Sequence, residues 1–232
     1  MATLPVGTVT FLFTDIEGST QLLRHLGDGY RGVVAQHRRV LREVASEHGG
    51  TEIDAQGDAF FFTFTRARDA LAAAIAGQRR LLAQTWPRDA EPKVRMGLHT
   101  GEPALGEEGY VGIDVVRGAR VAGAAHGGQI LISDATRALL PAELPDEARI
   151  VDLGEHTLKD MDRPERLFQI EAPGLATAFS TPRAEKMPGA HDFGERIDRY
   201  VKKQLDEAFR SIDLEESDRR SRRWRRLLGG DR

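Results

Sequence analysis

An α/β sandwich, with helices laid against one face of a sheet, is the fold class that this sequence predicts. Three observations support it. Short β-type runs alternate with longer segments of helical periodicity, the segments follow the order strand, helix, strand, strand, helix, strand, and glycines mark several of the breaks between them. This order is that of a ferredoxin-like sandwich with further elements added later in the chain. A chain of 232 residues is long enough for one such domain and an appendage.

The first predicted strand is the apolar run at residues 9–14, and Asp15 stands at its end. Gly18 then turns the chain into a helix that begins near Ser19. A helix N-terminus presents unpaired backbone N–H groups and the positive end of the helix dipole, and both suit an anion. A carboxylate beside a phosphate cradle makes chemical sense when a divalent cation lies between them. We therefore expect a site for a metal and a polyphosphate at this turn.

The next elements follow from periodicity and turn residues. Helical spacing continues over residues 19–48, and Gly27 and Gly29 are expected to divide this run into a short helix and a longer one. Gly57 and Asp58 stand where a tight hairpin would turn. The remaining expected elements are strands at 51–54 and 59–64, a helix at 66–86, a strand at 94–99, a polar loop around 107–108, a helix at 114–125, a strand at 129–133, a short helix ending near 140, and strands near 150–158 and 166–170.

The last part of the chain differs in composition. Residues 172–192 contain three prolines and several small residues, which predicts a linker between a domain at 1–171 and a final segment at 193–232. The final segment begins with apolar side chains on one helical face and ends with arginines around Trp224. An amphipathic helix that docks on its own domain or pairs in a dimer is expected. Contact with nucleic acid or an anionic membrane is the alternative, and the interspersed acidic residues favour the first.

Composition excludes several classes of protein and site. A net charge of -3 argues against a polyanion-binding chain, and the absence of cysteine excludes disulfides, thiolate zinc sites and cysteine nucleophiles. No stretch approaches the length of a membrane span, and the N-terminus lacks the pattern of a secretory signal. We therefore expect a soluble cytoplasmic protein that binds no nucleic acid.

Four motifs in order give the sequence a resemblance to a known family. They are FTDIEGST at 13–20, GDAF at 57–60, VRMGLHTG at 94–101, and Leu158-Lys159 before the last strand. Through them, residues 6–171 resemble the catalytic domain of class III adenylate and guanylate cyclases. The resemblance implies the nucleotide cyclase version of the ferredoxin-like fold and a head-to-tail homodimer with active sites at its interface. It also implies two Mg²⁺ or Mn²⁺ ions per active site, and conversion of a nucleoside triphosphate to a 3′,5′-cyclic nucleotide and pyrophosphate.

By this resemblance, Asp15 and Asp58 are the metal-binding aspartates, and the backbone carbonyl of Ile16 is a further ligand. Attack of the ribose 3′-OH on the α-phosphorus needs one cation to lower the pKa of that hydroxyl and another to neutralise the triphosphate. Oxygen ligands suit Mg²⁺ or Mn²⁺ rather than zinc. A helix cap for Asp15 and a turn position for Asp58 are the structural alternatives, but neither explains why both residues occur in matching contexts.

The phosphate-binding residues come from two segments. The backbone N–H groups of Glu17, Gly18 and Ser19 are expected to hold the β- and γ-phosphates. Lys159 matches a family lysine that contacts the triphosphate, although Asp160 follows it where glycine is usual.

Arg120 matches the family arginine that stabilises charge on the α-phosphate, and it would serve the active site that holds the partner's metals. A surface arginine on the helix at 114–125 is the alternative.

Three positions depart from the adenylate cyclase pattern in the region of the base and ribose. Asp54 replaces the lysine that donates to adenine, Gly109 replaces a second base-reading aspartate, and Val116 replaces the ribose-orienting asparagine. A carboxylate can only accept, so Asp54 suits guanine N1–H and N2–H or adenine N6–H. Loss of one positioned polar contact costs a factor of roughly 10² to 10³ in rate, so Val116 predicts slow turnover. Alternatively, Asp54 ends a strand in a turn and Val116 packs in the dimer interface.

The leading hypothesis is a homodimeric purine nucleotide cyclase, with ATP as first choice of substrate and GTP as second, of low activity and atypical base selectivity. The alternative is a weak or inactive cyclase-homology module that acts in nucleotide sensing or dimerisation. Intact metal ligands favour the enzyme, whereas the missing base and ribose contacts favour the module.

Overall fold

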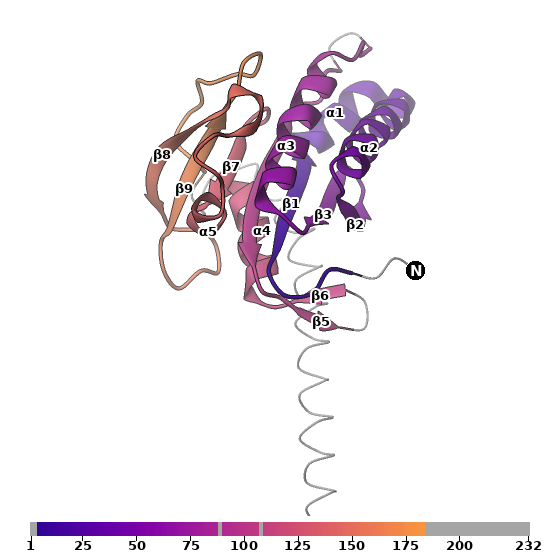
Figure 1. Cartoon of the computed structure of the whole chain (residues 1–232). Coiled ribbons are helices and arrows are strands. Elements are labelled where there is room, and N and C mark those ends of the chain that lie inside the picture. Colours follow the sequence, from indigo (N-terminus) through magenta and orange to yellow (C-terminus); the bar gives the residue numbers. More distant parts are fainter. Residues whose placement is uncertain (1–3, 88–89, 107–108, 184–232) are drawn as a thin grey trace, which may run out of the picture.

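The computed structural model describes residues 4–87, 90–106 and 109–183, and it contains a seven-stranded sheet and a separate two-stranded hairpin (Figure 1). The elements in chain order are β1 (Val9–Ile16), α1 (Ser19–Leu26), η1 (Gly27–Gly29), α2 (Tyr30–Glu47), β2 (Thr51–Gln56), β3 (Ala59–Phe64), α3 (Ala67–Leu82), β4 (Val94–Gly101), β5 (Ala104–Gly106), β6 (Gly109–Val111), α4 (Ile113–Ala124), β7 (Ile130–Ser133), α5 (Asp134–Ala138), η2 (Pro145–Glu147), β8 (Arg149–His156) and β9 (Glu165–Glu171).

The first four strands form the predicted ferredoxin-like core. They lie side by side in the order β2-β3-β1-β4, with α1 and α2 between β1 and β2 in the chain, and α3 between β3 and β4. The expected fold class is therefore confirmed. Strands β7, β9 and β8 extend the sheet beyond β4, and Figure 1 shows β8 and β9 at one side of the domain with α1 and α2 at the other. The β4–β7 pair is parallel, while the other neighbours are antiparallel.

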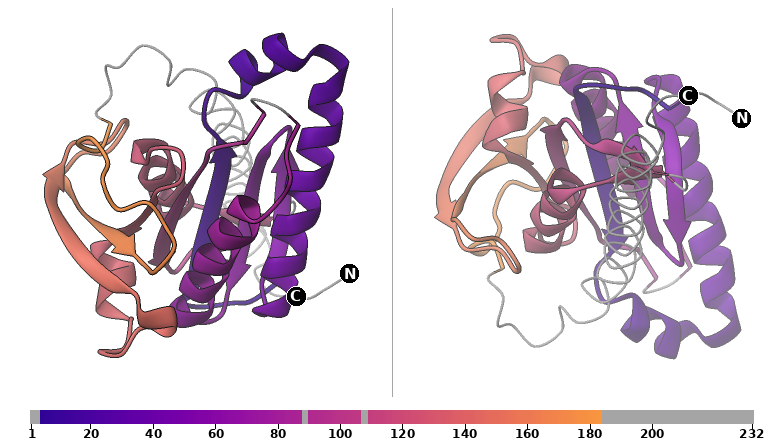
Figure 2. Two further views of the ribbon diagram at one scale, coloured as in Figure 1. Left: turned by 90° about the horizontal axis from the view of Figure 1, so that it is seen from above. Right: turned by 90° about the horizontal axis from the view of Figure 1, so that it is seen from below.

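Helices cover both faces of the sheet, so the expectation of a single covered face is wrong. Leu12 and Ile16 of β1 belong to a buried cluster with side chains of α2 and α3, whereas Phe11 and Phe13 belong to a second cluster with side chains of α4. Figure 2 shows α4 on the other side of the sheet from α3. Successive side chains of a strand point to opposite faces, so a nearly continuous apolar strand such as β1 is buried on both sides.

Helix α4 lies unusually close to the sheet because glycine lets it approach. A Cβ atom at Gly97 of β4 would lie 2.2 Å from the backbone nitrogen of Ala122, and one at Gly118 would lie 2.8 Å from the Phe13 ring. Small residues on both elements therefore allow backbone contact between helix and strand. This contact fixes the position of the helix that carries Arg120.

Two predicted turns have the expected form, and one hairpin was not predicted. A short 3₁₀ turn, η1, separates α1 from α2 at the two glycines, and the register pairs Gln56 with Ala59, so Gly57 and Asp58 form a two-residue hairpin loop. Gly57 has φ 63°, which suits glycine. The β5–β6 hairpin was expected to be a polar loop, because its three-residue strands are too short to show an alternating pattern.

The predicted amphipathic helix and arginine-rich segment at 193–232 lie outside the described residues, as do residues 184–192 of the predicted linker. The division of the chain into these segments therefore stays a prediction. Within the described part of the chain, no helix combines the length and the apolar character needed to cross a membrane.

The contact between α4 and β4 leads to a stability prediction. Gly97→Ala would force the new methyl group into the backbone of α4, and we expect it to lower the free energy of unfolding by about 3 kcal/mol or more. Gly32→Ala is the matched control, since a Cβ at this α2 position meets nothing within 4 Å. We expect this change to raise stability by about 0.5 to 1 kcal/mol through helix propensity. Urea unfolding of both variants measures the difference, and equal stabilities would contradict the close contact.

Candidate active site

The structure brings Asp58 to the strand end that carries Asp15. Strands β1 and β3 pair in a register that sets Thr14 opposite Phe60. Continuing this register by two residues places the β2–β3 turn beside Ile16. The Ile16 N–H donates to Asp58 Oδ2 at 3.3 Å, and both aspartates are buried, with 0% and 2% of their surface exposed. Two acidic side chains that are far apart in the sequence therefore lie at one end of β1.

A buried arginine, which sequence reasoning missed, neutralises Asp15. Arg95 Nε and Nη2 both donate to Asp15 Oδ2, at 3.1 and 2.7 Å. The register of β1 with β4 sets these two residues directly opposite each other. Arg95 thus approaches from β4, whereas Asp58 approaches from the side of β3, and β1 lies between those two strands. A charged residue inside the apolar strand motif at 94–101 was the available signal.

The donor set suits a hard divalent cation that is completed by a substrate. Asp15, Asp58 and the Ile16 carbonyl offer only oxygen atoms, and Mg²⁺ is commonly held by one or two carboxylates together with substrate phosphates. In the described ranges, no group of three or more His, Asp or Glu side chains gathers as a metal site. The residues fit cations shared with a triphosphate better than a cage made by the protein alone.

The turn after β1 has the conformation that its glycine allows. Gly18 has φ 67° and precedes α1 without a side-chain cap, and its carbonyl accepts from the N–H groups of Gln21 and Leu22 at 2.9 and 3.0 Å. The Glu17 N–H donates to the Lys93 carbonyl at 2.8 Å. The Glu17 N–H therefore already donates a hydrogen bond within the protein. Phosphate binding by the N–H groups of Gly18 and Ser19 stays a prediction.

Comparison with known proteins identifies the domain. A model of the adenylate and guanylate cyclase catalytic domain matches residues 1–171. The chain belongs to this family.

Relatives of this cyclase domain are similar over most of its length. A Mycobacterium tuberculosis protein described as uncharacterised is 39% identical over 184 residues, which make up 78% of this chain and 62% of that protein, so the chain spans less than two thirds of this relative. An adenylate cyclase of Podospora anserina is 26% identical over 246 residues, or 82% of this chain and 12% of that one. The solved structure of a Trypanosoma brucei adenylate cyclase in its monomeric state has a TM-score of 0.71 at 25% identity and covers 80% of this chain and 98% of that chain.

In this cyclase domain, the arginine that matches the family pattern forms an ion pair within its own chain. Arg120 of α4 is only 7% exposed, and its Nη2 contacts Asp160 Oδ2 from the loop between β8 and β9. Asp160 has φ 59°, a left-handed conformation in which glycine is favoured and aspartate is tolerated. Half-buried Lys159 precedes it, and Leu158 packs beside Val121 of α4. The aspartate at the glycine position therefore adds a carboxylate that contacts Arg120.

The three positions near the base and ribose are occupied by local or apolar contacts. Asp54 Oδ1 accepts from the Ala55 N–H at 2.8 Å, and its Oδ2 accepts from Gln56 Nε2 at 2.9 Å. Gly109 has φ 132°, which side chains rarely adopt. Val116 is buried among the aromatic side chains on the α4 face of the sheet, so its burial needs no partner chain.

A polar cluster that was not predicted ties the start of α4 to the sheet. His99 Nδ1 lies 2.7 Å from Ser133 Oγ, and its Nε2 lies 3.4 Å from Asp114 Oδ1. The hydrogen bond from His99, followed by the charges of His99 and Arg117 and the Glu102 N–H, holds the pKa of Asp114 below its usual value. The cluster orients α4, and hence Arg120, by side-chain contacts at both ends of the histidine ring.

A buried histidine on α2 lies near the second aspartate. Neither nitrogen of His37 has a hydrogen-bond partner in the described structure, and the ring packs 6.0 Å from that of Phe60. Burial lowers the pKa of His37 to about 4, while the charge of Asp58 opposes and that of Arg38 supports this shift. His37 is therefore neutral at physiological pH and is a core residue rather than a proton carrier.

This burial predicts how stability depends on pH. Because the pKa of His37 is about 4 in the folded state and 6.5 as the ordinary value, the unfolded chain binds a proton that the folded chain excludes as the pH falls below 6.5. Stability should then fall by about 2 kcal/mol between pH 7 and pH 5 through this residue. His37→Leu should remove that share of the pH dependence, and exposed His25→Gln should not. Urea unfolding at both pH values provides the measurement, and identical slopes in wild type and His37→Leu would contradict the assignment.

Proposed function

We propose that the protein is a purine nucleotide cyclase that converts ATP, or GTP as second choice, to the 3′,5′-cyclic nucleotide and pyrophosphate. The observation that carries this proposal is the hydrogen bond from the Ile16 N–H to Asp58, because it places the second acidic residue at the end of the strand that carries Asp15. Membership of the cyclase family supports the reaction class. Low turnover and atypical base selectivity are part of the proposal.

The acidic pair and the turn after it bind the reacting part of the substrate. Two Mg²⁺ or Mn²⁺ ions, held by Asp15, Asp58 and the Ile16 carbonyl, would lower the pKa of the ribose 3′-OH and neutralise the triphosphate. The N–H groups of Gly18 and Ser19 bind the β- and γ-phosphates at the positive end of α1. Arg95 orients the Asp15 carboxylate through its two hydrogen bonds.

The second half of the site comes from a partner copy. In a head-to-tail homodimer, Arg120 and Lys159 of one protomer face the acidic pair of the other, where the guanidinium stabilises charge on the α-phosphate. A cytoplasmic location belongs to the same proposal, because nucleoside triphosphates are made there. The contacts of Asp54 and Val116 support weak base and ribose recognition, since neither side chain offers the donor of the adenylate cyclase pattern.

Purified protein incubated with Mn²⁺ and ATP or GTP tests the reaction. We expect a cyclic product from wild type and at least about a 100-fold lower rate from Asp58→Ala, since a metal-holding carboxylate is lost. Glu155→Ala, an exposed acidic residue of edge strand β8, should leave the rate unchanged. If no product exceeds the Asp58→Ala level, the enzymatic proposal is wrong and the binding module becomes the better explanation.

Mixing two inactive variants extends this assay to the dimer. Asp58→Ala and Arg120→Ala each damage a different half of the interface site, so a heterodimer of the two keeps one intact site. An equal mixture should regain about a quarter of the wild-type rate if the chains exchange freely. A mixture as inactive as its components would argue against active sites shared between protomers.

The ion pair of Arg120 with Asp160 makes a separate prediction about turnover. A pair of this kind is worth about 1 kcal/mol, so removing it should raise the fraction of Arg120 available to the substrate, and with it kcat, by up to about fivefold. Both Asp160→Gly and Asp160→Asn keep a residue that tolerates the left-handed backbone. Asp162→Asn in the same loop is the control. A kcat that is unchanged or lower in both Asp160 variants would contradict a restraining role.

A further inference from the structure

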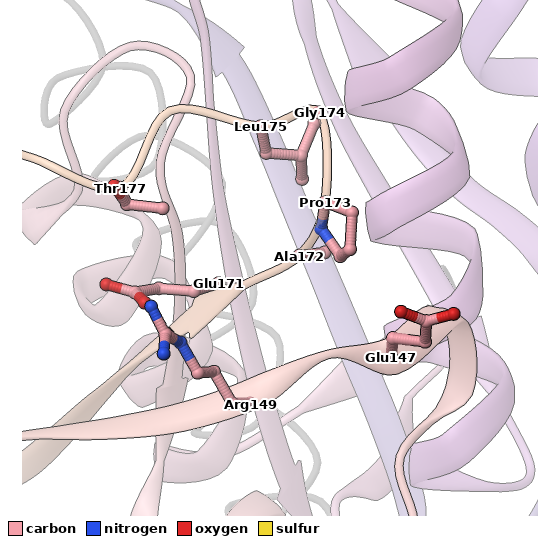
Figure 3. A pocket seen from close by; sticks show the side chains of 8 residues that line it. All are labelled: Glu147, Arg149, Glu171, Ala172, Pro173, Gly174, Leu175 and Thr177. Carbon is pink, nitrogen blue, oxygen red and sulfur yellow. Dashed lines mark hydrogen bonds and ion pairs between the residues drawn. The ribbon is translucent and has the colours of Figure 1, made fainter.

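The segment that follows β9 contacts the domain at several points along its described length. We call residues 172–183 the strap. Midway along it, the Thr177 carbonyl accepts from Gln169 Nε2 at 2.8 Å. Figure 3 shows the strap leaving β9 at Ala172 and turning through Pro173 and Gly174 beside a pocket of about 370 Å³, with Arg149 and Glu171 facing each other below. The strap thus begins at β9, which β4 and β7 separate from the strand that carries Asp15.

Its other end reaches the loop that follows α4. The Arg183 N–H donates to the Ala124 carbonyl at 3.0 Å, and His126 Nε2 donates to the Thr181 carbonyl at 3.0 Å. The Phe179 ring stacks on that of His126, with centroids 6.4 Å apart and planes inclined by 7°. Three independent contacts therefore fix residues 179–183 beside the helix that carries Arg120.

The side chain of Arg183 contacts the turn after β1. Its Nη2 forms an ion pair with Glu17 Oε1, while Glu17 Oε2 accepts from the Gly127 N–H at 3.0 Å. The Glu17 N–H is bonded to the Lys93 carbonyl. A Cβ atom at Gly127 would lie 2.5 Å from Lys93 Cβ and 2.8 Å from Glu17 Oε2, so this loop fits closely around the carboxylate. Glu17 is held by three segments at once.

The positive charge of Arg183 compensates the negative charge of Glu17 in the turn after β1. Glu17 immediately precedes the two residues proposed to bind phosphates, and an unpaired carboxylate there would repel a triphosphate. Arg183 neutralises it from a half-buried position, with 19% of its side chain exposed. Burial lowers the pKa of Arg183 from its ordinary value, but a guanidinium stays charged at physiological pH. An unpaired guanidinium in this position would be destabilising, which argues that the pair forms as a unit.

We propose that Arg183 is a positioning residue of the active site: through Glu17 it holds the turn at Gly18 and Ser19 and cancels the negative charge beside the triphosphate. The strap then contributes to the active site through Arg183. This inference rests on the proposed function for its effect on substrate, but the positioning of the turn can be measured without any reaction.

Amide hydrogen exchange of the full chain provides that measurement. Arg183→Ala should accelerate exchange by about tenfold at the hydrogen-bonded N–H groups of this turn, those of Glu17, Gln21 and Leu22, because one of the three contacts that hold Glu17 is lost. Arg149→Ala is the control. Arg149 Nε also pairs with a glutamate, Glu171 Oε2 at 2.7 Å, but this pair lies where the strap begins, and the Arg149 side chain is 75% exposed. This control should leave exchange at the turn unchanged. Equal exchange at these three N–H groups in wild type and Arg183→Ala would overturn the proposal, whether or not the protein is a cyclase.

Steady-state kinetics with Mn²⁺ and ATP then separate positioning from general stability. We expect Arg183→Ala to raise KM about tenfold with kcat within about twofold, because binding of the triphosphate is weakened equally in the ground state and the transition state. Arg183→Lys, which keeps the charge but not the fork of donors, should fall in between. The double variant Glu17→Gln with Arg183→Ala should have a KM within about twofold of wild type, since no unbalanced charge remains at this pair.

The outcomes distinguish the two proposals. A wild type that forms no cyclic nucleotide defeats the proposed function, and hydrogen exchange at the turn still decides the role of Arg183. The inference is wrong, and the proposed function stands, if wild type is active and the Arg183→Ala variant has a lower melting temperature but an unchanged KM. A KM increase that persists in full in the double variant would also overturn it, because charge compensation would then not be the cause.

Discussion

The buried ion pair between Asp15 and Arg95 is the interaction on which the rest of the site depends. The two side chains lie opposite each other on neighbouring strands, and both are almost wholly removed from water. Breaking such a pair by loss of one partner typically costs about 3 to 5 kcal/mol, because a buried charge is left uncompensated. A shift of one residue between β1 and β4 would separate the charges and exchange the side chains that β1 contributes to the two buried clusters. The register that folds the sheet is thus also the register that keeps a carboxylate ready for a cation.

Local signals predicted the parts of this protein that depend on neighbours in sequence. The Gly57-Asp58 hairpin, the break at Gly27 and the helix after Gly18 all follow from turn chemistry and periodicity, and the strand order gave the ferredoxin-like core. Other features depend on residues brought together from distant segments. The pairing of Arg95 with Asp15 and the contact of Arg183 with Glu17 were missed, because each requires knowledge of register or of the path of a loop. The second covered face was missed although the nearly continuous apolar character of β1 is a signal for it.

The substitutions near the base and ribose form a consistent pattern when seen with their contacts. The acidic pair, the arginine of α4 and the turn at Gly18 are the groups that the proposed function assigns to charge, and the chain retains all of them. The side chains at two of the positions near the base and ribose make contacts within the fold instead. Asp54 accepts hydrogen bonds from residues of its own strand, and Val116 packs in the apolar cluster between α4 and the sheet. In the proposed cyclase, recognition of the phosphates would therefore rest on buried, oriented groups, whereas recognition of the base would be left to shape and to the contribution of a second protomer.

The contact of α4 with the glycine at position 97 limits how this domain can move. A helix whose backbone rests on the backbone of a strand has no layer of side chains over which to slide, so α4 and the central strands behave as a single rigid body. Nucleotide entry and product release must then come from hinges elsewhere. The loop between β8 and β9 and, in the proposed homodimer, the relative rotation of two protomers are the remaining degrees of freedom, which would make exchange of ligand a property of that assembly more than of the individual chain.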